Sequence, residues 1–247
     1  MKMGFRNENR VRFQIHLIYK CNLKCKYCNE FMDLLNWDGD ETSITLEDLK
    51  RGADIIKSKR IQTNKLRIVG GEPTMHMHLK ECLELIVKEW LGNRKIVSSN
   101  GILPVPNVKG IRYKYSPIGG RRKMNHLPVM ISPFDLGIEP KIGFEDPCGQ
   151  SRYCGRSFDT YGFSPCPNAG PMGRLFGIDP YHSEPVLLGM REMCQHCIYS
   201  VGKKVMHKLM REVIEGKINY PTKSYKEGLK RQLDKPTFFK KFRERVN

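Results

Sequence analysis

The stretch Cys21-Asn-Leu-Lys-Cys25-Lys-Tyr-Cys28 places three cysteines in a C-x3-C-x2-C spacing near the start of the chain. It directly follows the apolar run Phe13-Gln-Ile-His-Leu-Ile-Tyr19, which predicts a buried strand. Three thiolates on one short loop can hold three corners of a [4Fe–4S] cluster and leave the fourth iron without a protein ligand. Such an iron can bind a small molecule, whereas a cluster with four cysteine ligands mainly stores or transfers electrons.

A structural zinc site is the alternative for this stretch, because C-x-x-C pairs are also common zinc ligands. A site of that kind closes with four ligands, normally from two knuckles. No Cys or His follows Cys28 within the next forty residues. The spacing therefore favours an iron–sulfur cluster.

Composition points to a polyanionic partner and to cysteines that bind metal. The 247 residues carry 43 basic and 26 acidic side chains, for a formal net charge of +17. Such an imbalance favours nucleic acid first, and then an anionic membrane surface or a phosphorylated small molecule. Eight of the nine cysteines fall into two groups, which suggests metal or cluster ligands in a reducing compartment rather than disulfides.

Localisation follows from two further features of the sequence. No apolar run approaches the ~20 residues that span a bilayer. The first twelve residues are charged and lack the apolar region of a signal peptide. We therefore expect a cytoplasmic protein that does not enter a membrane.

Strand and helix patterns alternate over the first half of the chain, which predicts βα units around a parallel sheet. The length fits an α/β fold, a partial (β/α) barrel of about five or six parallel strands with its site at their C-terminal ends. We expect a barrel core over 1–140, a cysteine-rich module over 141–202 and a basic amphipathic helical arm over 203–247. Besides the first strand, the expected strands are 66–69, 95–98, 110–115 and 128–131, and the expected early helices are about 45–60 and 79–91.

The second motif is Gly70-Gly-Glu-Pro73, at the end of the next expected strand. In this order the two motifs resemble the radical S-adenosylmethionine (SAM) superfamily, whose signature also has an aromatic before the third cysteine, here Tyr27. The resemblance implies that Cys21, Cys25 and Cys28 hold a catalytic [4Fe–4S] cluster whose open iron chelates SAM. It implies reductive cleavage of SAM to a 5′-deoxyadenosyl radical that abstracts hydrogen from a substrate. An electron donor such as a flavodoxin or ferredoxin is then expected.

The same resemblance implies where SAM is bound. The glycine-rich turn is expected to contact the SAM amino group, and the end of the third strand is expected to contact its ribose. An Asn-Gly pair, as at 100–101, is also an ordinary turn. The expected cofactor-binding residues are Tyr27, Gly70, Gly71, Glu72, Ser98 and Asn100.

A cationic loop follows the expected fourth strand and should lie at the same edge of the sheet. Arg121, Arg122 and Lys123 are consecutive cations next to a glycine pair. They are candidates for clamping a phosphate-bearing substrate. The alternative is an ordinary solvated surface loop.

The second group of cysteines comprises Cys148, Cys154, Cys166, Cys194 and Cys197. It resembles the short auxiliary-cluster module, of the twitch type related to SPASM domains, that follows the barrel in many radical SAM enzymes. The resemblance implies a second [4Fe–4S] cluster held by Cys166, Cys194 and Cys197 with Cys148 as the fourth ligand. Cys154 is then a spare thiol or a replacement ligand. A four-cysteine zinc site is the alternative, since spacing alone does not separate the two metals.

The C-terminal arm is basic and contains interleaved aromatic residues. From Lys217 onward it carries ten Lys or Arg against three acidic residues. Such a segment can follow a nucleic-acid backbone and stack on bases. The alternative is a helix whose Phe238, Phe239 and Phe242 cap the barrel.

These features predict a radical SAM enzyme that modifies an anionic substrate, DNA, RNA or a nucleotide. A maturase of ribosomal peptides that uses the auxiliary cluster is the second hypothesis. A non-catalytic protein that binds zinc and nucleic acid is the third.

Overall fold

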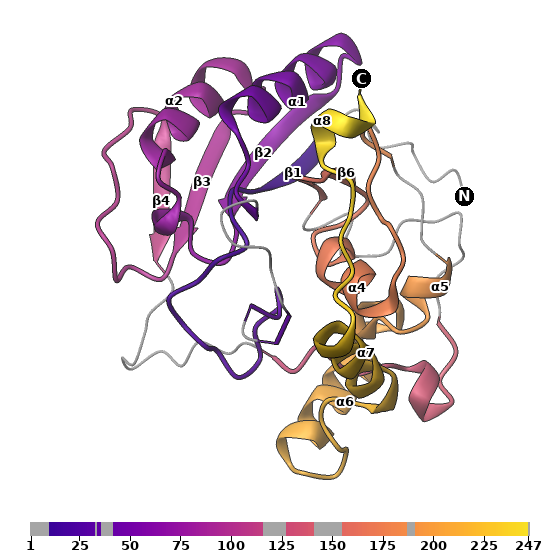
Figure 1. The fold of residues 1–247 in the computed structure, drawn as a ribbon. Coiled ribbons are helices and arrows are strands. Elements are labelled where there is room, and N and C mark those ends of the chain that lie inside the picture. Colours follow the sequence, from indigo (N-terminus) through magenta and orange to yellow (C-terminus); the bar gives the residue numbers. More distant parts are fainter. Residues whose placement is uncertain are drawn as a thin grey trace, which may run out of the picture.

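The computed structural model describes residues 10–32, 34–35, 42–115, 127–140, 155–186 and 191–246. Figure 1 shows a sheet covered on one face by two helices, α1 and α2, with a second group of helices, α4 to α7, away from them. No helix in the described part of the chain is both long and apolar enough to cross a bilayer. The molecule is thus a mixed α/β fold built from one sheet and two groups of helices.

The sheet has six strands in the order β4-β3-β2-β1-β5-β6. Neighbouring strands are parallel except for β5 and β6, which form an antiparallel hairpin. This confirms the predicted α/β fold with a mostly parallel sheet, although the sixth strand does not run parallel. The strands are β1 (Arg10–His16), β2 (Gln62–Val69), β3 (Arg94–Ser99), β4 (Ile111–Tyr115), β5 (Arg156–Asp159) and β6 (Gly162–Ser164).

The strand that pairs with the free edge of β1 comes from far along the chain. β5 pairs with β1 in parallel, with Phe13 opposite Arg156 and Ile15 opposite Phe158. Residues 156–164, which the sequence assigned to the cysteine-rich module, therefore extend the same sheet as β1 to β4. Sequence patterns cannot reveal this, because strand pairing at such separation depends on the tertiary structure.

The expected strand at 128–131 is wrong. This segment forms no strand, and its side chains are buried among the second group of helices instead of the sheet. Its backbone bonds to Thr222, whose N–H donates to the Met130 carbonyl at 3.1 Å and whose Oγ1 accepts from the Ser132 N–H at 2.9 Å. The apolar run thus packs in the core of the second group of helices and not in the sheet. The periodicity of its apolar residues does not distinguish between these two places.

Helices α1 (Leu46–Ser58) and α2 (Leu79–Glu89) form one layer of the molecule. Thr45 caps α1, since its Oγ1 accepts from the Asp48 N–H at 3.0 Å. Trp90, at the end of α2, is 2% exposed and donates its indole N–H to the Leu49 carbonyl at 2.9 Å. The two helices bury a core against one face of the sheet, which includes Phe13, Ile15, Leu66, Ile68, Val97 and the thiol of Cys82.

A second core joins the remaining helices, α4 (Ala169–Phe176), α5 (Arg191–Cys194), α6 (Lys203–Ile214) and α7 (Lys223–Asp234). Short 3-10 turns in the described residues include η2 (Pro73–Met75), η3 (Phe134–Leu136) and η4 (Ile198–Ser200). The amphipathic helix α6 begins the segment 203–247, for which the sequence predicted a helical arm. The second core includes Met130, Ile131, Met172, Leu175, Leu209, Met210 and Tyr225.

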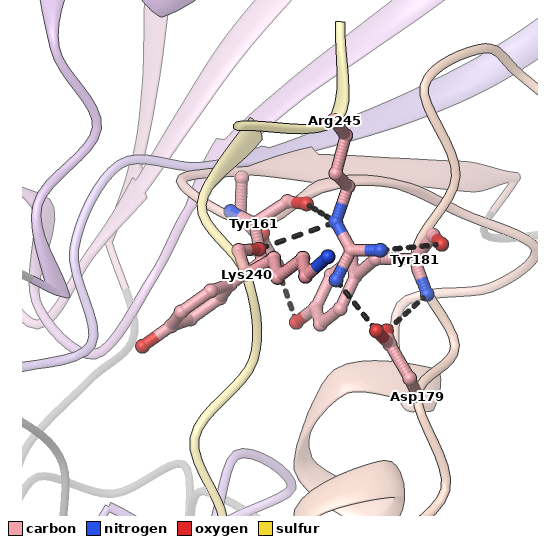
Figure 2. A network of polar contacts seen from close by, with 6 residues as sticks. Tyr161, Asp179, Tyr181, Lys240 and Arg245 are labelled. Carbon is pink, nitrogen blue, oxygen red and sulfur yellow. Dashed lines mark hydrogen bonds and ion pairs between the residues drawn. The ribbon is translucent and has the colours of Figure 1, made fainter. Parts of the chain in front are cut away.

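The C-terminal helix, α8 (Phe242–Arg245), packs back onto the β5–β6 hairpin. Phe242 is fully buried, with ring centroids 4.9 Å from Phe158 and 5.7 Å from Phe163. Figure 2 shows Arg245 reaching the carbonyl oxygens of Tyr161 at 2.9 Å and Tyr181 at 3.2 Å. Its Nη2 also pairs with Asp179 at 2.6 Å. Phe242 therefore has the capping role proposed as the alternative to nucleic-acid binding, whereas Phe238 lies before α8 and is exposed.

Candidate functional site

The cysteine loop leaves β1 and is held by the turn that ends β2. The Gly71 N–H donates to the Ile18 carbonyl at 2.7 Å, and the Glu72 N–H donates to the Lys20 carbonyl at 2.8 Å. A Cβ at Gly70 would lie 2.4 Å from the Ile18 oxygen, and a Cβ at Gly71 would lie 2.2 Å from the Lys20 oxygen. The two glycines are therefore required for the backbone approach that fixes the start of the cysteine loop.

Glu72 is buried and its carboxylate is enclosed by hydrogen-bond donors. Oε1 accepts from the Thr74 N–H at 3.1 Å, from the Thr74 hydroxyl at 2.7 Å and from the Ser99 hydroxyl at 2.8 Å. Oε2 accepts from the Asn100 N–H at 2.7 Å. The side chain thus links the end of β2 to the end of β3 and orders both predicted SAM-binding segments.

The end of β3 is joined in turn to the cysteine loop. The Asn100 amide donates to the Asn22 side chain at 2.7 Å, one residue after Cys21. Asn100 therefore lies beside the cysteine loop. Ser98 points to the other side of the strand, where Arg67 Nη2 lies 3.5 Å from its hydroxyl. Ser99, the next residue of the same strand end, is the serine that contacts Glu72, because successive side chains of a strand point to opposite faces.

The three cysteines of the loop are each partly exposed. The Cys28 N–H donates to the Cys25 carbonyl at 3.0 Å, which closes a turn, and the Leu23 N–H lies 3.4 Å from Cys21 Sγ. Burial raises the pKa of Cys28 to about 11 and, together with the nearby Glu72, raises that of Cys21. Metal binding at these thiols therefore has to release protons.

Tyr27, a residue of the cysteine loop, contacts the C-terminal arm. Its ring meets Tyr220 edge-to-face with centroids 5.2 Å apart, and the Lys26 ammonium lies 5.2 Å from the Tyr27 centroid. Burial raises the pKa of Tyr220 to about 12, with smaller contributions from Tyr27 and Cys28. The segment before α7 is thus part of the wall around the cysteine loop, a contact that the sequence did not suggest.

A buried polar network lies on the opposite side of the loop, where β1 and β5 end. Asp159 accepts from the hydroxyls of Tyr19 at 2.5 Å and Tyr181 at 2.9 Å. His16 Nδ1 lies 3.5 Å from the carboxylate of Glu30, two residues after Cys28. Burial opposes protonation of His16, but Glu30 and Asp159 outweigh it and raise its pKa. Sequence reasoning missed this network, because it depends on the pairing of β5 with β1.

In a comparison with protein families, residues 15–113 match the family described as the Radical SAM superfamily. These residues form a radical SAM domain. A domain of this kind implies an enzyme that uses a [4Fe–4S] cluster and SAM. The matched residues run from the end of β1 into β4 and include the cysteine loop, the Gly70–Glu72 turn and the end of β3.

One curated relative is the molybdenum cofactor biosynthesis protein 1 of Dictyostelium discoideum. It is 31% identical over 98 residues, which are 39% of this chain and 15% of that protein. Two crystal structures of BtrN, one in complex with AdoMet and 2-DOIA and one in an open conformation, match with TM-scores of 0.31 and 0.32. Their identities are 17% and 15%, and they cover 37% and 40% of this chain and 36% and 43% of theirs. Such scores do not establish a shared overall fold.

The cysteine loop of the radical SAM domain carries Cys21, Cys25 and Cys28 on one short segment. Backbone hydrogen bonds from Gly71 and Glu72 hold the start of this loop at the end of β2. Three thiols on one such loop fit three corners of a [4Fe–4S] cluster.

The second cysteine group is described only in part. Cys166 lies between β6 and α4, and its carbonyl accepts from the Ala169 N–H at 3.1 Å. Cys194 ends α5 and accepts from the Cys197 N–H at 3.1 Å, which makes a tight knuckle. Helices α4 and α5 are in contact, so the structure brings the two halves of this group to neighbouring elements. Cys148, Cys154 and the loop residues Arg121, Arg122 and Lys123 lie outside the described residues.

Proposed function

We propose that this protein is a radical SAM enzyme that abstracts hydrogen from an anionic substrate and modifies a nucleic acid or nucleotide. The observation that carries the proposal is the loop of Cys21, Cys25 and Cys28, bound to the Gly70–Glu72 turn through backbone hydrogen bonds. A [4Fe–4S] cluster held by these thiols would supply the electron that cleaves SAM to methionine and a 5′-deoxyadenosyl radical.

The residues around the loop have distinct roles in this proposal. The N–H groups of Gly71 and Glu72 are used by the loop backbone, so carbonyl oxygens are what the turn can offer to the SAM amino group. Glu72 is a positioning residue, because its carboxylate is engaged by Thr74, Ser99 and Asn100. Asn100 borders the loop and is the proposed contact for the ribose. Tyr27 and Tyr220 form an apolar wall that limits water around Cys28.

The auxiliary cluster remains part of the proposal. Cys166, Cys194 and Cys197, with Cys148 or Cys154, would hold it at the second group of helices. The arrangement of α4 and α5 supports this, since α4, which begins three residues after Cys166, contacts α5, which ends at Cys194. Such a cluster would accept an electron from the substrate radical, anchor the substrate or stabilise the fold.

The nature of the substrate rests on charge. A net charge of +17 favours a polyanion over a neutral peptide. The proposed partners are DNA, RNA or a nucleotide, with a flavodoxin or ferredoxin as electron donor. The alternatives, a peptide maturase and a zinc protein that binds nucleic acid, are outcomes of the test below.

The test is 5′-deoxyadenosine release from anaerobically reconstituted protein with SAM and dithionite, run alone and with DNA, RNA, nucleotides or a peptide pool. We expect release to be stimulated by nucleic acid or nucleotide and weakened by Arg121→Ala/Arg122→Ala. The variant Cys21→Ala/Cys25→Ala/Cys28→Ala should abolish release, whereas Cys82→Ala, which changes a core cysteine, should retain it. Stimulation by peptides alone would favour the maturase, and a colourless protein that binds zinc and releases nothing would exclude the enzyme.

A further inference from the structure

The face of the sheet opposite α1 and α2 carries a row of cations. The strand register places Arg12 opposite Lys65 and Lys65 opposite Arg94, so three positive side chains cross β1, β2 and β3 side by side. The next positions along these strands, Phe13 and Leu66, point into the core under the helices. Because side chains alternate along a strand, the row belongs to the other face.

Three more cations lie on the same face, toward the ends of the strands that bear the radical SAM site. Arg67 follows Lys65 by two residues, and Ile96 pairs with both Arg67 and Arg112. Lys114 pairs with Ser98, whose hydroxyl Arg67 approaches at 3.5 Å. We call the set of Arg12, Lys65, Arg67, Arg94, Arg112 and Lys114 the cationic sheet face.

This arrangement destabilises the sheet in the absence of a counter-charge. Like charges directly opposite each other on neighbouring strands are unfavourable. Burial lowers the pKa of Lys65, and Arg67, Arg12, Arg94 and Lys114 lower it further. Within the described residues, no carboxylate forms an ion pair with Lys65. A concentration of cations that costs stability and lies next to an active site indicates a site for an anion.

We propose that the cationic sheet face binds the polyphosphate group of a nucleoside triphosphate substrate. The choice of substrate class rests on the function proposed above, whereas anion binding by this face does not. The guanidinium groups of arginine and the ammonium group of lysine bind phosphate oxygens through charge-assisted hydrogen bonds. The face also reaches the cysteine loop, because Arg67 pairs with Gln14 of β1, and His16, two residues further along the same face, lies 3.5 Å from Glu30, which follows Cys28 by two residues. A nucleotide anchored here would extend toward the loop.

The shape of the array favours a nucleotide over a nucleic-acid strand. Neighbouring strands lie about 4.8 Å apart, so the row from Arg12 to Arg94 spans about 10 Å, and Lys65 and Arg67 are separated by about 7 Å. A compact patch of this size surrounds one polyphosphate. Single-stranded nucleic acid is usually held by aromatic platforms beside the cations. None of the described side chains on this face of β1 to β4 is a Phe, Tyr or Trp.

The experiment is calorimetric titration of the reconstituted full chain with inorganic triphosphate, ATP, GTP and a single-stranded RNA. We expect triphosphate and at least one nucleoside triphosphate to bind, and Lys65→Gln or Arg67→Gln to weaken binding about tenfold each. Lys230→Gln removes the same charge from an exposed position on α7 and should leave binding unchanged. In the absence of ligand, Lys65→Gln should unfold at a higher temperature than the wild type, because it relieves the repulsion.

Three outcomes would overturn the inference: no binding of triphosphates, equal binding by wild type and Lys65→Gln, or binding of RNA without binding of nucleotides. Any of these together with normal 5′-deoxyadenosine release would leave the proposed function standing. Triphosphate binding that depends on Lys65, in a protein that never cleaves SAM, would support the anion site and contradict the proposed function.

Discussion

The Glu72 carboxylate accepts four hydrogen bonds, all from groups of this chain. Its oxygens bond to Thr74, Ser99 and Asn100, and its own N–H holds the cysteine loop through Lys20. A buried carboxylate with this many donors is a rigid support. At the level of single residues, the motif therefore contributes positioning as well as any direct contact with SAM.

His76, three residues after Pro73, shows how a neutral side chain fixes the following segment. Its Nε2 lies 2.9 Å from the Ile44 carbonyl, which can only accept, and its Nδ1 accepts from the His78 N–H at 3.1 Å. Both ring nitrogens are thus used by the neutral imidazole. Burial lowers the pKa of His76 below its model-peptide value of 6.5.

This arrangement predicts a loss of stability in acid. Because the folded pKa is lowered, the contribution of His76 is fully present above about pH 6.5 and decreases as pH falls through the folded value. Measured by denaturant unfolding, the stability difference between wild type and His76→Gln should narrow as the pH falls from 7.5 to 5. His207→Gln, an exposed control on α6, should show no such change. A constant difference over this range would contradict the assigned neutral state.

At the level of elements, the site is a junction of three strand ends. The cysteine loop follows β1, the glycine turn ends β2 and Asn100 ends β3, and hydrogen bonds connect all three. At this junction the backbones approach so closely that no side chain fits at Gly71. Elements that are individually ordinary thus become a site through their parallel alignment.

A substitution at Gly71 should therefore disrupt the loop more than a glycine replacement elsewhere. In Gly71→Ala the new Cβ would meet the Lys20 carbonyl carbon at 2.6 Å as well as its oxygen, so the loop must move. We expect loss of iron from the first cluster and a free energy of unfolding lowered by about 2 kcal/mol or more. Gly216→Ala, where nothing lies within 4 Å, should cost only about 1 kcal/mol for its left-handed backbone and retain iron. Equal iron contents in the two variants would show that the glycine approach does not support the cluster.

For the whole molecule, the β5–β6 hairpin connects the sheet to the rest of the chain. It pairs with β1, contacts α8 through Phe242 and leads directly to Cys166. Cys166 of the second group therefore follows a hairpin that is tied to the radical SAM domain. If the second group holds a cluster, the sheet sets the position of Cys166 relative to the first cluster.

Iron analysis of the whole protein tests this arrangement. With two clusters, anaerobic reconstitution should give about eight irons per chain. Changing Cys21, Cys25 and Cys28 to Ala, or Cys194 and Cys197 to Ala, should each leave about four. Single changes of Cys148 and Cys154 identify the fourth auxiliary ligand as the one whose loss reduces iron. A wild type with about four irons, all lost with Cys21, Cys25 and Cys28, would show that the second group holds no cluster.

The amino-acid sequence by itself determined the class of the protein and most of its first half. Thiolate spacing, the glycine turn and the apolar periodicities are local signals, and the structure confirms strands and helices at these places. These signals can be recognised in the sequence because the chemistry or the backbone geometry requires particular residues a few positions apart.

Only the tertiary structure decided the remainder. It placed β5 beside β1 and aligned Arg12 with Lys65 and Arg94 across three strands. It also placed residues 129–131 in the second core and buried Phe242. Each of these depends on contacts between residues tens of positions apart. The register of a sheet and the partner of an apolar segment are set by the packing of the whole chain, so no local pattern could show them.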